Sequence, residues 1–186
     1  MIAEVLSVDD ARERYRRFLQ GDKEALADLV RDYHKGLTLY LNGILGNICD
    51  AEDMAQETFA RIMLKRPVMQ ENVSFKTWLY SIGKHAAIDM LRHRTLLTFE
   101  YLGDNVAVSD ENILEKDYLV EEEKINLYRA LKEIKKEYMQ VLYLMFFEEL
   151  SVEEIACILG KNRKAVYNLV ANAKAALRKK LTEQEG

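Results

Sequence analysis

The chain has 186 residues, of which 49% are hydrophobic and 31% charged, and this composition is typical of one medium-sized or two small soluble domains. One proline and eight glycines among many helix-forming residues favour an all-α fold. No basic-then-apolar leader opens the sequence and no apolar run approaches the roughly 20 residues of a membrane span, so we expect a cytoplasmic protein without direct membrane insertion.

The formal net charge of −4 is concentrated in the middle of the chain. Residues 1–95 carry 14 basic and 14 acidic side chains, residues 96–122 carry one and eight, and residues 123–186 carry 12 and nine. We therefore predict two small helical domains, 1–95 and 123–186, joined by a flexible acidic linker at 96–122. A short helix starting at Asn112 fits within this linker.

Apolar residues recur at helical spacing through the N-terminal domain. A helix expected near Val8–Leu19 ends at Gly21, and a second helix follows from Leu26 to Ile48. Asp50 stands where the N-cap of the next helix belongs. The buried side of that helix is predicted to hold Met54, Phe59, Ile62 and Met63.

A loop and a long helix complete this domain. The Lys65–Val73 stretch, which contains Pro67, is the predicted ordered loop. Ser74 is the predicted N-cap of a helix that ends in the basic run Arg92–Arg94.

The C-terminal domain carries the signature of a helix-turn-helix. A helix from Glu121 and a second one with the apolar run Val141–Phe147 come first. Ser151 and Glu154 then form a capping box, and Gly160 permits the left-handed backbone that ends this short helix. The buried face of the following helix is predicted to hold Val166, Leu169 and Ala173. Since the second helix of such a motif enters the DNA major groove, nucleic acid is the predicted partner.

Nothing in the sequence points to catalysis, a metal or a cofactor. Cys49 and Cys157 lie far apart without nearby ligand residues, and we interpret both as small buried side chains. The three histidines, His34, His85 and His93, have no evident catalytic partners, and His34 is expected at the surface boundary. We predict a protein that is not an enzyme and has no catalytic residues.

Three motifs together resemble the extracytoplasmic function (ECF) sigma factors. They are Asp50–Phe59, read as DAEDMAQETF, Phe75–Ile82, read as FKTWLYSI, and Ala87–Arg92, read as AIDMLR. The family has them in this order, ahead of a linker and a helix-turn-helix. The resemblance covers about residues 20–95 and 120–181.

This resemblance implies a bacterial transcription initiation factor. Its N-terminal domain would bind the clamp helices of the largest subunit of RNA polymerase core and melt the minus-ten promoter element. The Lys65–Val73 loop would supply the pocket for an unstacked base, and the C-terminal domain would read the minus-thirty-five element as duplex. An anti-sigma factor is a common partner in the family, and the linker permits the free chain to pack its two domains together.

The candidate polymerase-binding residues lie off the apolar face of the Asp50–Phe59 helix. Acidic and amide side chains there suit charge-assisted bonds to a basic partner helix. They are Glu52, Asp53, Gln56 and Glu57, and the strongest candidates are Asp53 and Gln56.

The candidate DNA-binding residues fall on two helices. The long helix after Ser74 offers side chains for a phosphate backbone or for base stacking, although an indole there is more often part of a core. These are Lys76, Trp78, Lys84, His85 and Arg92. The second helix of the helix-turn-helix offers Arg163, Lys164, Tyr167, Asn168 and Asn172, and a bidentate pairing with adenine is open to Asn168.

Four positions depart from the family pattern. His85 stands where asparagine is usual, Lys161 replaces an apolar turn residue, Ala165 replaces threonine and Asn172 replaces arginine. The lost cation suggests weaker or altered recognition of the minus-thirty-five element. The alternative function is a stand-alone helix-turn-helix regulator that does not require polymerase core, but it leaves the two N-terminal motifs unexplained.

Overall fold

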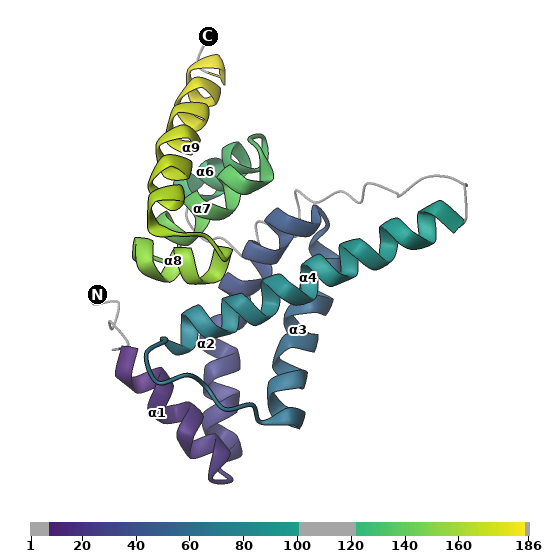
Figure 1. Cartoon of the computed structure of the whole chain (residues 1–186), viewed down its shortest axis with the longest axis vertical. Helices are drawn as coiled ribbons and strands as arrows, with labels where there is room; N and C mark the ends of the chain where they lie inside the picture. The colour runs from purple at the N-terminus through teal and green to yellow at the C-terminus, as the bar shows by residue number, and fades with distance from the viewer. Residues whose placement is uncertain (1–7, 101–121, 185–186) are drawn as a thin grey trace.

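The computed structural model describes residues 8–100 and 122–184, and every regular element in these two ranges is a helix, which confirms the all-α fold (Figure 1). The N-terminal part contains α1 (Val8–Leu19), α2 (Lys23–Leu45), α3 (Ile48–Lys65) and α4 (Phe75–Glu100). The C-terminal part contains α6 (Glu122–Lys132), α7 (Lys136–Phe146), α8 (Val152–Leu159) and α9 (Arg163–Gln184). Most of the predicted linker, including the helix expected from Asn112, lies outside the described residues.

The start of α3 differs from the prediction. Gly46 takes a left-handed conformation (φ 75°) and ends α2, so only Gly46 and Asn47 separate the two helices. The Asn47 side chain accepts the backbone N–H of Asp50 (3.1 Å) and is the N-cap. The prediction of Asp50 as the cap was wrong, and Asp50 lies in the first turn, where a carboxylate complements the helix dipole.

Helix α4 begins as predicted but ends later. The Ser74 hydroxyl accepts the backbone N–H of Thr77 (3.2 Å), which confirms its capping role. The helix continues past Arg94 to Glu100 because no glycine or proline follows before Gly103. Figure 1 shows this distal half of α4 extending beyond the other helices.

The local signals of the helix-turn-helix are confirmed. Ser151 and Glu154 form the complete capping box at the start of α8, and Gly160 adopts φ 64° at its end. The buried face of α9 consists of Val166, Val170, Ala173 and Leu177, and the predicted Leu169 is only partly buried beside them.

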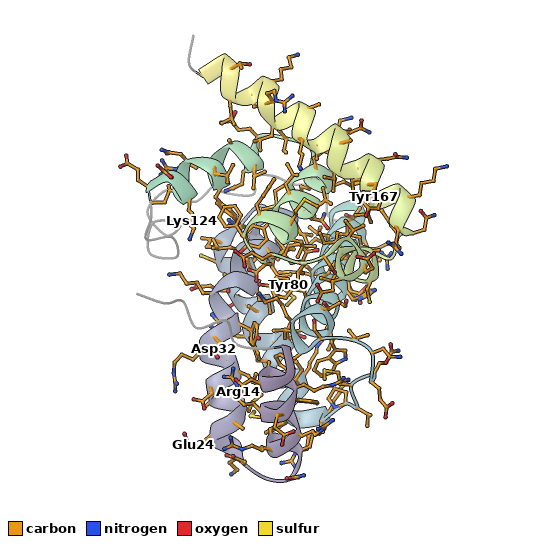
Figure 2. All side chains as sticks on the ribbon, turned by 90° about the vertical axis from the view of Figure 1, so that its left-hand side faces the viewer. Arg14, Glu24, Asp32, Tyr80, Lys124 and Tyr167 are labelled. Atoms are coloured by element: carbon orange, nitrogen blue, oxygen red, sulfur yellow. The ribbon has the colours of Figure 1, made fainter. Side chains whose placement is uncertain are left out.

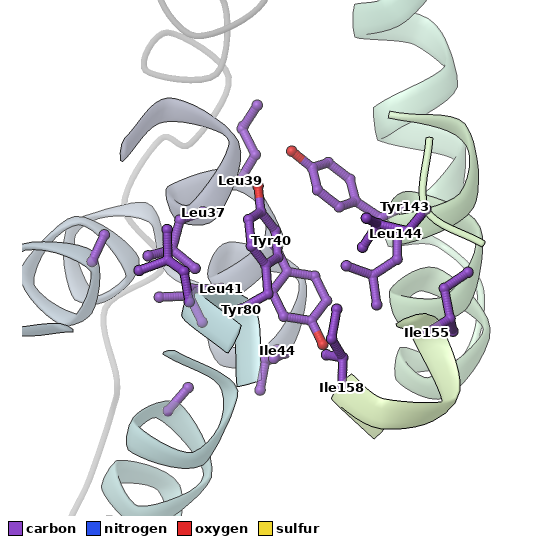
Figure 3. Close-up of a cluster of buried hydrophobic side chains, with 14 of the residues drawn as sticks. Leu37, Leu39, Tyr40, Leu41, Ile44, Tyr80, Tyr143, Leu144, Ile155 and Ile158 are labelled. Carbon is purple, nitrogen blue, oxygen red and sulfur yellow. The ribbon is translucent and has the colours of Figure 1, made fainter. Parts of the chain in front are cut away.

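The two domains share one continuous hydrophobic core, because α8 packs against α4 and α7 packs against α2. Figure 3 shows Tyr40 and Tyr80 of the N-terminal domain facing Tyr143 and Leu144 of the C-terminal domain. The Tyr40 and Tyr80 rings lie 5.4 Å apart, centroid to centroid, and Tyr40 lies 6.0 Å from Tyr143. The expectation that the chain can pack its domains together is therefore met in this structure.

Four predicted core positions are exposed instead. Cys49 and Cys157 lie on the outer sides of α3 and α8, because their neighbours Ile48 and Ile158 take the buried positions. Met63 is 50% exposed on the outer side of α3, while Ile62 next to it is buried. Phe146, at the end of α7, is 47% exposed and carries the Lys174 ammonium over its ring.

Candidate polymerase and nucleic-acid interfaces

The four candidate side chains of α3 lie together on its outer side. Asp53 and Gln56 are exposed, and Glu52 and Glu57 are half-buried. The opposite side packs into the core through Ala51, Met54, Ala55, Thr58, Phe59 and Ile62. Arg61 donates to the Glu57 carboxylate one turn away (2.9 Å from Nε). Neither Asp53 nor Gln56 makes a side-chain hydrogen bond to another described residue, so both remain available to a partner.

A bidentate ion pair ties α3 to α4. The two terminal nitrogens of Arg94 reach the two carboxylate oxygens of Asp50 at 2.6 and 2.7 Å. The Asp50 side chain is 19% exposed, and this planar two-bond geometry is the strong form of such a pair. It fixes the first turn of α3 against the distal half of α4.

Two candidate DNA-binding lysines of α4 are engaged by the C-terminal domain. Lys76 Nζ lies 3.2 Å from the Glu148 carboxylate and donates to the Glu148 backbone oxygen at 3.2 Å. Lys84 Nζ donates to the backbone oxygens of Ile158 and Leu159, both at 3.2 Å, where α8 ends. A cation at this position satisfies otherwise unpaired carbonyl groups of the helix terminus. Neither lysine is presented to DNA in this arrangement.

The charge of Lys84 is partly destabilised by its surroundings. Burial lowers the pKa of Lys84, the nearby Lys161 lowers it further, and Glu137 has the opposite effect. Because a lowered lysine pKa disfavours the charged form, holding Lys84 against α8 carries a desolvation cost.

The other candidates on α4 separate into surface and core. His85 and Arg92 are exposed, with His85 Nδ1 2.6 Å from the Ser81 backbone oxygen and Arg92 3.4 Å from Asp89. Trp78 is half-buried, and its ring lies 5.1 Å from that of Tyr15 and 5.8 Å from that of Phe75. These contacts favour a packing role for the indole.

The candidate residues of α9 form an open surface. Arg163, Lys164, Tyr167, Asn168 and Asn172 are all exposed, and Figure 2 shows Tyr167 at the edge of the molecule, far from the central Tyr80. Arg163 pairs with Glu153 of α8 at 2.6 Å, but both side chains are more than half exposed. An exposed pair of this kind contributes little to stability, so Arg163 can leave Glu153 and bind a phosphate or a base instead.

A carboxylate shared by two helix caps is a contact that sequence reasoning missed. Glu154 closes the capping box with Ser151, accepting its backbone N–H at 3.0 Å. Its other carboxylate oxygen accepts the hydroxyls of Ser74 (3.0 Å) and Thr77 (3.1 Å) at the start of α4. Burial alone would raise the pKa of Glu154, but the hydrogen bonds from Ser151, Ser74 and Thr77 lower it below its ordinary value. Both caps can be predicted from the sequence, whereas the contact between them, which joins residues 80 positions apart, cannot.

A second missed contact is a buried polar cluster around Glu148. The Tyr143 hydroxyl lies 3.3 Å from the Glu148 carboxylate and donates to the Gly36 backbone oxygen at 3.0 Å. Burial raises the pKa of the Tyr80 hydroxyl well above its ordinary value, and the charge of Glu148 raises it further. A Cβ at Gly36 would lie 2.5 Å from a Glu148 oxygen and 2.6 Å from the Tyr80 hydroxyl, so any other residue here would force these side chains to move.

Other site types are not seen in the part of the chain that the structure describes. No helix there combines the length and apolar character needed to cross a membrane. The same residues contain no group of three or more His, Cys, Asp or Glu side chains arranged around a possible metal ion.

Comparison with known proteins decides the family. Residues 29–96 match sigma-70 region 2, and residues 124–177 match sigma-70 region 4. The ECF RNA polymerase sigma factor SigW of Bacillus subtilis is 30% identical over 183 residues, covering 92% of this chain and 97% of that protein. The chain belongs to the ECF sigma factors.

Two solved structures share the fold. CnrH, in complex with the cytosolic domain of CnrY, superposes with a TM-score of 0.67 at 20% identity, covering 93% of this sigma factor and 97% of that chain. The sigma factor RpoE of Bartonella quintana, in complex with the anti-sigma factor NepR, gives 0.68 at 18% identity, with 84% and 96% covered.

Family membership confirms the predicted function. This ECF sigma factor directs RNA polymerase core to promoter DNA and is not an enzyme. The stand-alone regulator is thereby set aside, because the region 2 match accounts for the two N-terminal motifs that it left unexplained.

Proposed function

We propose that residues 1–95 bind polymerase core and open the minus-ten element, while residues 123–186 read the minus-thirty-five element as duplex. The observation that carries this division is the presence of two separate outward surfaces: the acidic and amide face of α3 and the polar face of α9. The first suits a basic protein surface and the second suits a DNA groove. Since the polymerase acts on the chromosome, the sigma factor works in the cytoplasm.

The α3 face is the proposed contact for the clamp helices of the largest polymerase subunit. Exposed Asp53 and Gln56 would form its centre, with Glu52 and Glu57 beside them. Carboxylates paired with arginine or lysine of a partner helix make hydrogen bonds about twice as strong as neutral ones.

The α9 face is the proposed reader of the minus-thirty-five element. Arg163 and Lys164 stand at the start of the helix, where base edges or phosphates come within reach in a helix-turn-helix complex. Tyr167, Asn168 and Asn172 continue this exposed side, and Asn168 would pair with adenine.

The α4 face is proposed to bind promoter DNA only after the domains separate. Lys76 and Lys84 contact α8 and its flanking turn in the described arrangement, while His85 and Arg92 stay exposed. We infer that this arrangement is a closed form of the sigma factor. Binding to core would exchange the contacts with Glu148 and the end of α8 for contacts with phosphate.

An anti-sigma factor is the proposed regulator. Two of the structures that share this fold, CnrH and RpoE, are complexes, the first with the cytosolic domain of CnrY and the second with the anti-sigma factor NepR. A partner that favours the closed form over the open one would keep α4 from DNA by shifting the population of the two states.

Co-elution with purified core tests the proposal. The wild-type sigma factor should bind core and need it for firm promoter binding. The double variant Asp53→Ala/Gln56→Ala should lose core association while keeping its helical content and melting temperature, because both side chains are exposed. Arg31→Ala on α2, which removes an exposed helical ion pair with Asp28, is the matched control. Unchanged co-elution of the double variant would contradict the proposed interface.

A further inference from the structure

Helix α1 precedes the region 2 match, which begins at residue 29. The helix is nevertheless well anchored, with Tyr15 and Phe18 almost fully buried. Its buried side faces α2, α4 and the loop Arg66–Ser74 that joins α3 to α4.

The loop Arg66–Ser74 has little internal support of its own. It contains no helix or strand, and it carries a long backbone hydrogen bond from Val73 to Gln70 (3.5 Å). Arg66, the first residue of the loop, takes a left-handed conformation with φ 45°. A loop of this length without further contacts would sample many conformations.

Three side chains of α1 supply these further contacts. Arg12 donates its two terminal nitrogens to the backbone oxygens of Gln70 and Glu71. The Tyr15 hydroxyl donates to the Pro67 backbone oxygen at 2.6 Å. The Phe18 ring lies under the Arg66 guanidinium at 5.2 Å. The loop is therefore held near its start, at Arg66 and Pro67, and again at its middle, at Gln70 and Glu71.

The anchors from Arg12 and Tyr15 act on the backbone and leave the outward side chains of the loop unused. Val68 is 89% exposed, and Leu64, in the last turn of α3, is 77% exposed. Apolar side chains on a fixed backbone can pack against an unstacked base at a lower ordering cost, because the loop is ordered before the base arrives.

We propose that α1 is the positioning element of the base-reading loop, with Arg12 and Tyr15 as its positioning residues. This inference rests on the proposed reading of the minus-ten element by the loop. Neither residue touches the base; each acts by fixing a carbonyl group of the loop and hence the direction of the side chains between them.

The test uses holoenzyme assembled from purified core and the full-length sigma factor. The probe is a single-stranded DNA pool randomised over the minus-ten positions, and base enrichment after capture is the readout. Arg12→Ala combined with Tyr15→Phe should reduce enrichment at the preferred positions about tenfold, because a loop without these anchors holds its side chains in less defined positions; misplacement by about 1 Å can cost about a hundredfold even in a reaction rate. Affinity for core should not change. Amide exchange within residues 66–74 should become faster.

Arg16→Ala is the matched control, because Arg16 is exposed on the same helix and pairs there with Glu13 (3.1 Å). It should enrich the same bases as the wild type. If the double variant enriches the same bases as the wild type, the inference about α1 is overturned, while the proposed function is not affected. An equal loss of core affinity and of capture of every sequence would also overturn it, because it would show a general folding defect. If wild-type holoenzyme enriches no base at these positions, the loop does not read the promoter, and the proposed function fails together with the inference.

Discussion

The two candidate DNA-binding helices of this ECF sigma factor, α4 and α9, differ in how much of their polar surface is accessible. The candidate residues on the polar side of α9 are exposed, and the ion pair of Arg163 with Glu153 of α8 lies in solvent. Helix α4, by contrast, has Lys76 and Lys84 bound to the C-terminal domain. The chain thus presents the surface that we propose reads duplex DNA, while part of the surface that we propose opens the strands is covered. The difference arises from the packing of the domains and not from either helix alone.

Removing Glu148 should have the largest effect on this difference. Glu148→Ala leaves Lys76 without its carboxylate and the Tyr80 and Tyr143 hydroxyls without their acidic neighbour. Because the pair is partly buried, breaking it should cost up to about 3 kcal/mol, and the domains should separate. Fluorescence energy transfer between labels on α2 and α9 should report the longer distance.

The matched control is Glu149→Ala, since Glu149 is the exposed neighbour in sequence. If Glu148→Ala keeps the wild-type transfer efficiency, the buried cluster does not hold the closed form.

The open surface of α9 can be tested by removing its proposed base contacts. Arg163→Ala and Asn168→Ala should each weaken binding of holoenzyme to a minus-thirty-five duplex by about 2 kcal/mol. The exposure of both side chains means that the melting temperature should stay the same. Competition against mutated duplexes provides the measurement. An equal loss on every sequence would show that the residue contacts only phosphate.

Gly43, a glycine at the domain boundary, allows the closed form to be disrupted by a steric change alone, without removing a charged side chain. Gly43 lies within α2, and a Cβ there would come 2.1 Å from Sδ of the buried Met139 on α7. Gly43→Ala should therefore weaken domain packing by about 1–2 kcal/mol. Within α2 itself, alanine favours the helix by up to about 1 kcal/mol. Limited proteolysis and energy transfer should show separated domains with intact helices.

The double variant Gly43→Ala/Met139→Ala distinguishes a clash from other causes. Removing the Met139 side chain should relieve the steric contact and return part of the closed population. If the closed population does not increase in the double variant, a clash with Met139 is not the reason why Gly43→Ala separates the domains.

The shared cap at Glu154 should give the smallest effect, visible as a dependence on pH. The pKa of Glu154 is lowered below its ordinary value of 4.5, so its contribution to the closed form is present above pH 4.5 and is lost as the pH falls through the lowered value. Glu154→Gln should remove this acid-dependent step while changing the free energy of unfolding at neutral pH by about 1 kcal/mol or less. Acid titrations of wild type and variant, followed by energy transfer, should differ only below that point.

Local chemistry made much of the fold predictable from the sequence. The capping box of Ser151, the left-handed Gly160 and the cap at Ser74 are each decided within four residues, and all three are confirmed. The cap of α3 was missed because Asn47 and Asp50 are both good capping residues, and the position of Gly46 selects the former.

The packing of the domains was beyond detailed prediction. Contacts such as Glu154 with Ser74, or Lys84 with the end of α8, join positions that no local pattern relates. The sequence indicates which side chains are basic, but the tertiary structure decides whether they meet phosphate or carbonyl groups. The same reason explains the exposed Cys49 and Cys157, since small side chains occur on either side of a helix.

The pairing of Lys76 with Glu148 has a consequence for ionic strength. The Glu148 side chain is 10% exposed and that of Lys76 is 29% exposed, so dissolved ions screen this pair only weakly. Lysine contacts with DNA phosphate are weakened steeply by added salt, because each one releases condensed counterions. Rising salt concentration therefore destabilises the promoter-bound state more than the closed form, and the balance between the two depends on the ionic strength around the protein.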